Sequence, residues 1–163
     1  MRALFPASFD PVTNGHVDIL ARSHRTFETV IAAVYDGGED KTLFSLDERL
    51  ELLTTVTCDF PNVLVRSYSG LTVDFAHEVG AGVLLRGLRA ISDFEYEFAY
   101  SAMNRRLDAE IDVLCYLSTP EHAFVSSSLV REVGSLGRSV EEFVPTNVAS
   151  AVAAKFAPDA GRR

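Results

Sequence analysis

The first part of the chain holds residues that could bind a phosphate group. Ser8 adds a hydroxyl after the apolar residues 3–5, and His16 follows Gly15 at the point where helical spacing begins. A short strand, a loop of small residues and a helix N-terminus bring unpaired backbone N–H groups and the positive end of the helix dipole together. Gly15 allows a ligand to approach the backbone closely. We therefore predict a phosphate site here; the alternative is a solvated loop whose histidine only caps the helix.

Two further segments carry cationic or hydroxyl side chains. Residues 86–89 (RGLR) hold two arginines, and an arginine can bind two phosphate oxygens at once. Ser126, Ser127 and Ser128 open a predicted helix, where hydroxyls and free N–H groups suit a β- or γ-phosphate. Two alternatives need no ligand. The serines could form an ordinary helix cap, and the arginines could pair with nearby acids, namely Asp93, Glu95 or Glu97.

Alternating strands and helices must position these residues. Short apolar or β-branched runs predict strands at residues 3–5, 28–35, 62–67, 82–86 and 111–117. Helical spacing predicts helices from near His16, after a capping box of Ser45 and Glu48, and at residues 72–79, 94–107, 126–133 and 147–156. Ser92 or Asp93 is the predicted cap of the helix at 94–107, whose apolar spacing we assign to Phe94, Phe98 and Ala102 or Met103.

This alternation predicts an α/β fold: a Rossmann-like, doubly wound, five-stranded parallel sheet with helices on both faces. We expect one domain over residues 1–157 and a disordered tail at 158–163. In such sheets, ligands bind beyond the carboxyl ends of the strands, where the strand order reverses. Hydroxyl and cationic side chains follow most of the predicted strands: Ser8, His16, Lys41, Thr72, Arg86, Arg89 and residues 126–128. The sequence therefore predicts a polyphosphate site at this edge.

The composition excludes several classes of function. The 163 residues carry a net charge of -8, which argues against broad nucleic-acid binding through a basic surface. No apolar run reaches membrane-spanning length and no signal-like segment is recognisable, so we predict a cytoplasmic protein without a membrane partner. Cys58 and Cys115 have the spacing of neither metal ligands nor a disulfide framework, and we predict no metal site formed by the protein alone.

Three segments, in order, resemble a known enzyme family. Residues 8–16 (SFDPVTNGH) resemble the T-x-G-H signature of the nucleotidylyltransferase superfamily, whose fold is Rossmann-like. Residues 85–97 (LRGLRAISDFEYE) resemble the R-G-L-R and D-F-E-Y-E block of the phosphopantetheine adenylyltransferase family. Residues 124–132 (FVSSSLVRE) are similar to its I-S-S-S-x-x-[KR]-E motif. The resemblance extends over nearly the whole chain.

The resemblance implies roles for individual residues. His16 would stabilise the transition state, with Lys41 and Arg86 as further catalytic residues. The acceptor, 4'-phosphopantetheine, would contact Ser8, Lys41, Thr72, Arg86 and Asn104. ATP would contact Ser8, Phe9, His16, Gly87, Leu88, Arg89, Glu97, His122, Ala123, Phe124, Val125, Ser126, Ser127 and Ser128. The alternatives are an ordinary helix surface for Asn104 and a solvated loop for His122.

Two positions depart from the family pattern. Ala7-Ser8 stands where the family usually has Gly-[Thr/Ser], which preserves the hydroxyl. Counted without gaps from His16, the family's phosphate-binding lysine aligns with Asp40, and Lys41 lies one residue later.

The implied reaction is transfer of AMP from ATP to 4'-phosphopantetheine, giving dephospho-coenzyme A and pyrophosphate, with Mg²⁺ carried by ATP. The resemblance also implies a homohexamer and feedback binding of coenzyme A. Two alternatives stay open. One is a transferase of the same superfamily that acts on nicotinamide mononucleotide or uses CTP with an alcohol phosphate. The other is a nucleotide-binding or coenzyme A-sensing protein without turnover.

Overall fold

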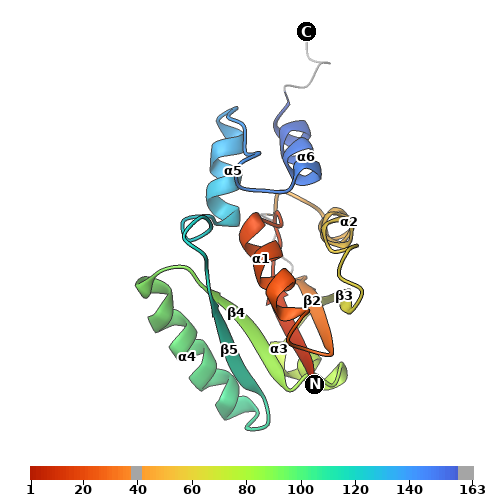
Figure 1. Ribbon diagram of the computed structural model, residues 1–163, viewed down its shortest axis with the longest axis vertical. Helices are drawn as coiled ribbons and strands as arrows, with labels where there is room; N and C mark the ends of the chain where they lie inside the picture. The colour runs from red at the N-terminus through yellow and green to blue at the C-terminus, as the bar shows by residue number, and fades with distance from the viewer. Residues whose placement is uncertain (38–41, 158–163) are drawn as a thin grey trace.

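Strands and helices alternate along the chain, as Figure 1 shows for a computed structural model that describes residues 1–37 and 42–157. In chain order the elements are β1 (Arg2–Ala7), α1 (Asn14–Ser23), β2 (Thr29–Tyr35), α2 (Leu46–Val56), β3 (Val63–Tyr68), α3 (Thr72–Glu78), β4 (Val83–Leu88), α4 (Ile91–Leu107), β5 (Asp112–Leu117), α5 (Ser127–Ser135) and α6 (Thr146–Phe156). Lys41 and the predicted tail at 158–163 lie outside the described residues.

The five strands form one sheet in the order β3-β2-β1-β4-β5, and every neighbouring pair is parallel. The strand order therefore reverses between β1 and β4. Leu4 of β1 lies level with Ile31 of β2 and Leu84 of β4, and all three side chains are buried, as expected for the centre of a sheet covered on both faces. This architecture confirms the predicted doubly wound α/β fold.

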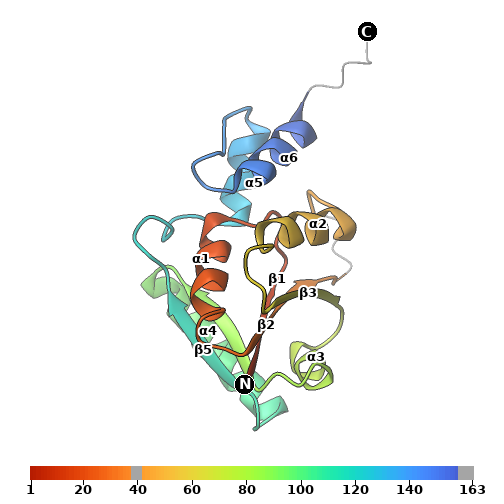
Figure 2. The same ribbon diagram turned by 45° about the vertical axis from the view of Figure 1, so that its right-hand side comes forward.

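Each face of the sheet packs against its own helices, because successive side chains of a strand point to opposite faces. On one face, Phe5 and Leu85 pack in a core with apolar side chains of α1, α2, α5 and α6. On the other face, Leu4 and Leu84 pack in a core with α3, and Tyr100 of α4 lies against it. The turned view in Figure 2 shows α5 and α6 beyond the upper end of the sheet, at the end opposite the N-terminus.

Local signals explain where two helices begin. Ser45 and Glu48 form the predicted capping box of α2: the Ser45 hydroxyl accepts from the Glu48 N–H, and the Glu48 carboxylate accepts from the Ser45 N–H. Thr13 caps α1 in the same way with His16 as the third residue, so this helix begins two residues before the predicted start. Both caps satisfy N–H groups that a helix N-terminus otherwise leaves unpaired.

Two predicted boundaries around β4 and α4 are wrong. β4 continues two residues past Arg86, because Gly87 and Leu88 still pair with β5. α4 begins at Ile91, and no side chain caps it. Asp93 is not the cap, since its carboxylate accepts hydrogen bonds from the backbone N–H and the Nε of Arg89 instead.

The predicted apolar face of α4 does not pack on the core of this chain. Phe94, Phe98 and Met103 are 57%, 67% and 64% exposed, whereas the polar side chains of Glu97 and Asn104 are buried. The face that α4 turns toward the sheet therefore carries polar groups, and its outer face is apolar.

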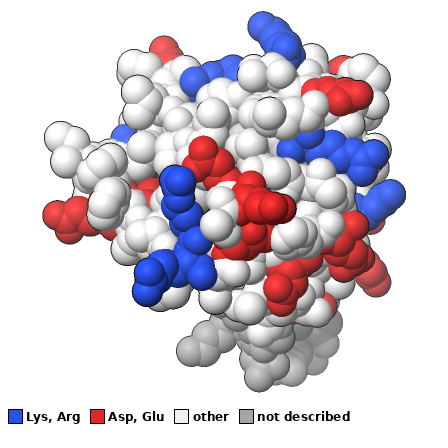
Figure 3. All heavy atoms as spheres, turned by 90° about the horizontal axis from the view of Figure 1, so that it is seen from below, with Lys and Arg blue, Asp and Glu red and all other residues white. Residues whose placement is uncertain are grey.

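The lower end of the molecule, at the amino ends of the strands, shows acidic and basic side chains interspersed on one face (Figure 3). In the part of the chain that the structure describes, no helix is long and apolar enough to cross a membrane.

Candidate functional site

A pocket of about 550 Å³ lies at the carboxyl ends of β1 and β4, where the strand order reverses. This volume lies within the range of small-molecule sites. Residues from all three predicted segments line it: Ser8, Gly15 and His16; Arg86, Gly87, Arg89 and Glu97; His122, Val125, Ser126, Ser127 and Ser128. The fold therefore brings together residues that are more than a hundred positions apart in the sequence.

His16 is held in one orientation by the cap of α1. The backbone N–H of Thr13 donates to Nδ1 of His16 at 3.0 Å, and the Thr13 hydroxyl accepts from the His16 N–H at 3.4 Å. Because Nδ1 accepts a hydrogen bond, the neutral imidazole carries its proton on Nε2. His16 is thus a hydrogen-bond donor through Nε2 at the N-terminus of a helix.

The pKa of His16 is lowered from 6.5 to about 4. Burial contributes most, and the rings of Phe9 and Phe5 lie 4.9 and 6.0 Å from the imidazole. The positive charges of Arg89 and then Arg86 lower the pKa further. His16 is therefore neutral at physiological pH.

The loop after β1 contains a strained residue. Phe9 has a φ of 49°, in the left-handed region that bulky side chains rarely adopt, and its side chain is 1% exposed. The buried ring packs edge-on against Phe5. The side chain of Phe9 thus belongs to the core, so a contact of this residue with ATP would be made by its backbone.

Arg86, in β4, and Arg89, the residue directly after β4, both pair with carboxylates of α4. Arg86 donates from Nε and NH2 to the two carboxylate oxygens of Glu97, both at 2.8 Å. Arg89 donates from Nε to Asp93 at 3.2 Å and from NH1 to the carbonyl of Val125 at 3.4 Å. Of the alternatives left open by the sequence, the pairs with Glu97 and Asp93 are present, and Glu95 is exposed.

The three serines at the start of α5 have different partners. Ser126 caps the helix and accepts from the Leu129 N–H at 3.2 Å, which agrees with the alternative that the serines form an ordinary helix cap. Ser127 donates to the carbonyl of Pro11 at 2.8 Å and so ties α5 to the loop after β1. All three serines also line the pocket, so the N-termini of α1 and α5 face the same space.

Gly87 has a packing role that the sequence did not indicate. A Cβ at this position would lie 2.8 Å from the Cδ1 of Ile19, so the glycine allows α1 to lie close to β4.

Several predicted residues do not line the pocket: Phe9, Leu88, Ala123, Phe124, Thr72 and Asn104. Thr72 begins α3, and its hydroxyl lies 3.0 Å from that of Tyr68. Asn104 is 5% exposed and donates to the Tyr100 carbonyl at 2.7 Å, so the alternative of an ordinary helix surface is wrong for it. The predicted residue Lys41 is outside the described ranges.

Three residues that the sequence analysis did not assign support the site. Arg131 lines the pocket and pairs with Asp10, whose buried carboxylate also accepts from the N–H groups of Leu43 and Phe44 at 2.9 Å. Arg49 is 4% exposed and donates to the carbonyls of Ser8 and Tyr35. The sixth position of the S-S-S-x-x-R motif could have indicated Arg131, whereas Asp10 and Arg49 become visible only in the fold.

The site has few carboxylates available for a metal ion. Among residues 1–37 and 42–157, no three His, Cys, Asp or Glu side chains group as a metal site. The two carboxylates of α4 that line the pocket are paired with arginines.

A pocket at the switch point of a parallel α/β sheet is the usual place of a nucleotide site in such folds, and the family comparison identifies the class as a nucleotidyltransferase. The model of the family described as cytidylyltransferase-like matches residues 4–133. A solved structure from Vibrio parahaemolyticus, provisionally assigned as a nicotinate-nucleotide adenylyltransferase, has the same fold with a TM-score of 0.71. It shares 16% identity, and the match covers 96% of each chain.

Sequence comparison narrows this class to one family. The chain is 46% identical to the phosphopantetheine adenylyltransferase of Thermomicrobium roseum over 158 residues, which cover 95% of each protein. It is 49% identical to the phosphopantetheine adenylyltransferase of Roseiflexus castenholzii over 150 residues, 92% of this chain and 94% of the relative. This nucleotidyltransferase belongs to the phosphopantetheine adenylyltransferase family.

Proposed function

We propose that the protein transfers the adenylyl group of ATP to 4'-phosphopantetheine, giving dephospho-coenzyme A and pyrophosphate. Family membership supports the substrates. The observation that carries the proposal is the neutral imidazole of His16, fixed by Thr13 at a helix N-terminus in the pocket that also holds Arg86 and Arg89. A hydrogen-bond donor and cations fixed around one cavity are what an in-line attack on phosphorus requires.

In this mechanism the acceptor phosphate attacks the α-phosphorus of ATP, and pyrophosphate leaves. A phosphate monoester is already ionised at neutral pH, so the acceptor needs no strong general base. His16 donates from Nε2 to an α-phosphate oxygen and stabilises the charge that develops in the transition state. Arg86, with Ser8 and Lys41, binds the acceptor phosphate. Arg89 and the serines of α5 bind the departing pyrophosphate.

The remaining assignments extend this proposal to the rest of both ligands. Gly87, Leu88, Glu97 and residues 122–125 contact the nucleotide, in part through backbone groups. Thr72 and Asn104 lie outside the pocket lining, and their contact with the pantetheine arm requires that arm to extend past Arg86.

Mg²⁺ enters with ATP in this proposal. The hydroxyls of Ser126, Ser127 and Ser128 and the paired carboxylates of α4 fit a metal ion coordinated mainly by nucleotide phosphates. When bound, the ion neutralises charge on the phosphates and favours departure of pyrophosphate.

Assembly, regulation and location also remain proposals. A homohexamer would bury the apolar outer face of α4, where Phe94 and Phe98 are mostly exposed. Feedback binding of coenzyme A in the same cleft and a cytoplasmic location are expectations from the family resemblance.

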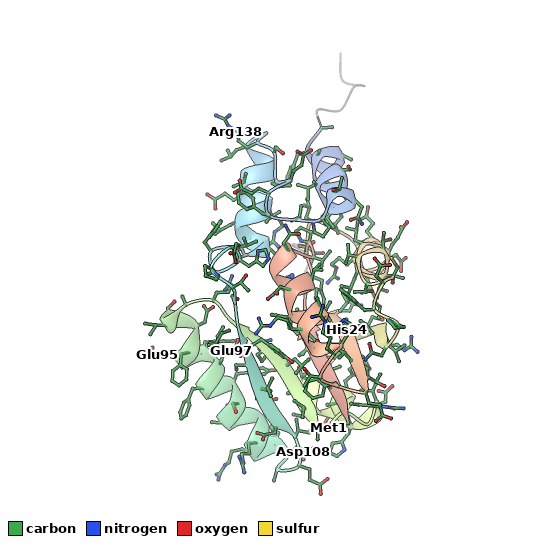
Figure 4. The ribbon with its side chains drawn as sticks, in the orientation of Figure 1. Met1, His24, Glu95, Glu97, Asp108 and Arg138 are labelled. Atoms are coloured by element: carbon green, nitrogen blue, oxygen red, sulfur yellow. The ribbon has the colours of Figure 1, made fainter. Side chains whose placement is uncertain are left out.

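The test is pyrophosphate release with ATP and magnesium, with and without 4'-phosphopantetheine. Release should depend on the acceptor, and His16→Ala should lower kcat by about 10²–10³-fold with a smaller change in ATP binding. His24→Ala is the matched control, because His24 follows α1 and stacks on Phe60 at 4.8 Å outside the pocket lining. Figure 4 labels His24 on its side chain.

Three other outcomes would each count against part of the proposal. Normal turnover of His16→Ala would remove His16 from the mechanism. Turnover with another acceptor, such as nicotinamide mononucleotide, would replace the substrate. ATP binding without turnover on any acceptor would favour a sensor.

A further inference from the structure

Helix α4 carries its acidic side chains on two different faces. Figure 4 shows Glu97 directed toward β4 and Glu95, two residues earlier, directed away from the sheet. Glu97 is 6% exposed, whereas Glu95 is exposed to solvent. A carboxylate is rarely buried unless it is paired, and the partner of Glu97 is Arg86.

The guanidinium of Arg86 is fixed on three sides. Its Nε and NH2 donate to the two oxygens of Glu97 at 2.8 Å each, and NH1 donates to the carbonyl of Pro6 at 3.3 Å. The face of the guanidinium lies over the ring of Tyr100, with the central carbon 4.6 Å from the ring centroid. These contacts restrict the rotation of the guanidinium, so the protein fixes the direction from which a ligand can bind Arg86.

These contacts leave a defined part of Arg86 available. An arginine has five N–H donors, and Glu97 and Pro6 accept from three of them. One N–H of NH1 and one of NH2 have no partner among the described residues. Because Glu97 occupies the Nε–NH2 edge, the NH1–NH2 edge is the other edge of the planar group where two N–H groups lie parallel. Two parallel N–H groups on one edge match two oxygens of a phosphate.

We propose that Glu97 is a positioning residue for the acceptor: it turns Arg86 so that the NH1–NH2 edge receives the acceptor phosphate as a bidentate pair. Tyr100 supports the same orientation from the next turn of α4. This inference rests on the proposed function and revises one part of it. Glu97 acts on the acceptor side through Arg86, rather than by direct contact with ATP.

The two roles predict different kinetic effects of Glu97→Gln, which keeps the size of the side chain and removes its charge. If Glu97 positions Arg86, the KM for 4'-phosphopantetheine should rise about 10-fold, with the KM for ATP changed by less than about twofold. Glu95→Gln is the matched control on the same helix and should leave both constants unchanged.

A double-mutant cycle tests whether Glu97 acts through Arg86. Glu97→Gln in an Arg86→Gln background should add less than about a twofold change, because the group that Glu97 orients is already absent. Glu97→Asp keeps the carboxylate on a shorter side chain and should give an intermediate KM for the acceptor. This variant also serves if thermal melting shows that Glu97→Gln does not fold.

The outcomes separate this inference from the proposed function. A rise in the KM for ATP alone, or effects of Glu97 and Arg86 that multiply in the double variant, would overturn the inference and leave the reaction intact. Wild-type protein without acceptor-dependent pyrophosphate release would overturn both.

Discussion

The two sides of the pocket are built by different kinds of interaction. On the side of β1, α1 and α5, the pocket is formed mainly through backbone groups. These are two helix N-termini, the first capped by Thr13, and the Pro11 carbonyl, which accepts a hydrogen bond from Ser127. On the side of β4 and α4, side-chain ion pairs hold the cations, Arg86 with Glu97 and Arg89 with Asp93.

The two sides differ in how their polar groups are held in place: backbone groups are fixed by the fold, whereas arginine side chains can change orientation. Backbone N–H groups at a capped helix end cannot turn away from a ligand, so they suit the atoms where charge develops in the reaction. An arginine has a long side chain and needs partners to fix its orientation. Each partner also determines how many N–H donors of the guanidinium remain available to a ligand. In the proposed mechanism, the first side therefore holds His16 against the reacting phosphorus, and the second side holds the arginines that bind the substrate phosphates.

The largest effect on stability is expected from Asp10, on the backbone side. Asp10→Ala would leave two backbone N–H groups and the partly buried Arg131 without their carboxylate, at an expected cost of about 3 kcal/mol in the free energy of unfolding. Urea denaturation would measure the loss.

Asp18→Ala is the control for that experiment. Asp18 pairs with Arg22 on α1 at 3.0 Å, and the arginine is 37% exposed, so its removal should cost less than about 1 kcal/mol. Equal losses in the two variants would show that the loop after β1 is not fixed through Asp10.

An intermediate effect is expected from pH. The pKa of His16 in the folded protein, about 4, is below the unfolded value of 6.5, so the unfolded chain binds more protons between these values. The free energy of unfolding should therefore fall as the pH drops through this window, and kcat should show no titration of His16 near 6.5.

NMR titration of the His16 ring, together with urea denaturation of wild type and His16→Ala across the same window, would measure this effect. The variant should lose less stability than wild type as the pH falls. A His16 pKa near its ordinary value would contradict the neutral-donor mechanism.

The smallest effect is expected from Asp93, on the side-chain side. Its pair with Arg89 is partly exposed, at 25% and 41%, so Asp93→Asn should change the free energy of unfolding by less than about 0.5 kcal/mol. Arg89 keeps its contact with the Val125 carbonyl, and the KM for ATP should rise only about twofold. A stability loss as large as that of Asp10→Ala would show that ion pairs of α4 also carry the framework.

Much of the backbone side could be predicted from the sequence, because its signals are local. Residues 8–16 indicated a loop before a helix, and the serines at 126–128 indicated the start of α5. The same reasoning was wrong at α4, where Ser92 or Asp93 was expected as the cap: no side chain caps this helix, and Asp93 instead pairs with Arg89. A carboxylate near a helix start satisfies either role, and only the position of the neighbouring strand selects between them.

Residue order alone was enough to predict the alternation of strands and helices, the carboxyl edge as the place of the pocket, and the family. These follow from short-range periodicity, caps and motifs. Which carboxylate pairs with which arginine became visible in the folded chain: Glu97 of α4 pairs with Arg86 of β4, and Asp10 pairs with Arg131, 121 positions away. Such pairings depend on which distant segments the fold brings to the same edge of the sheet, and a pattern within a short segment does not predict this.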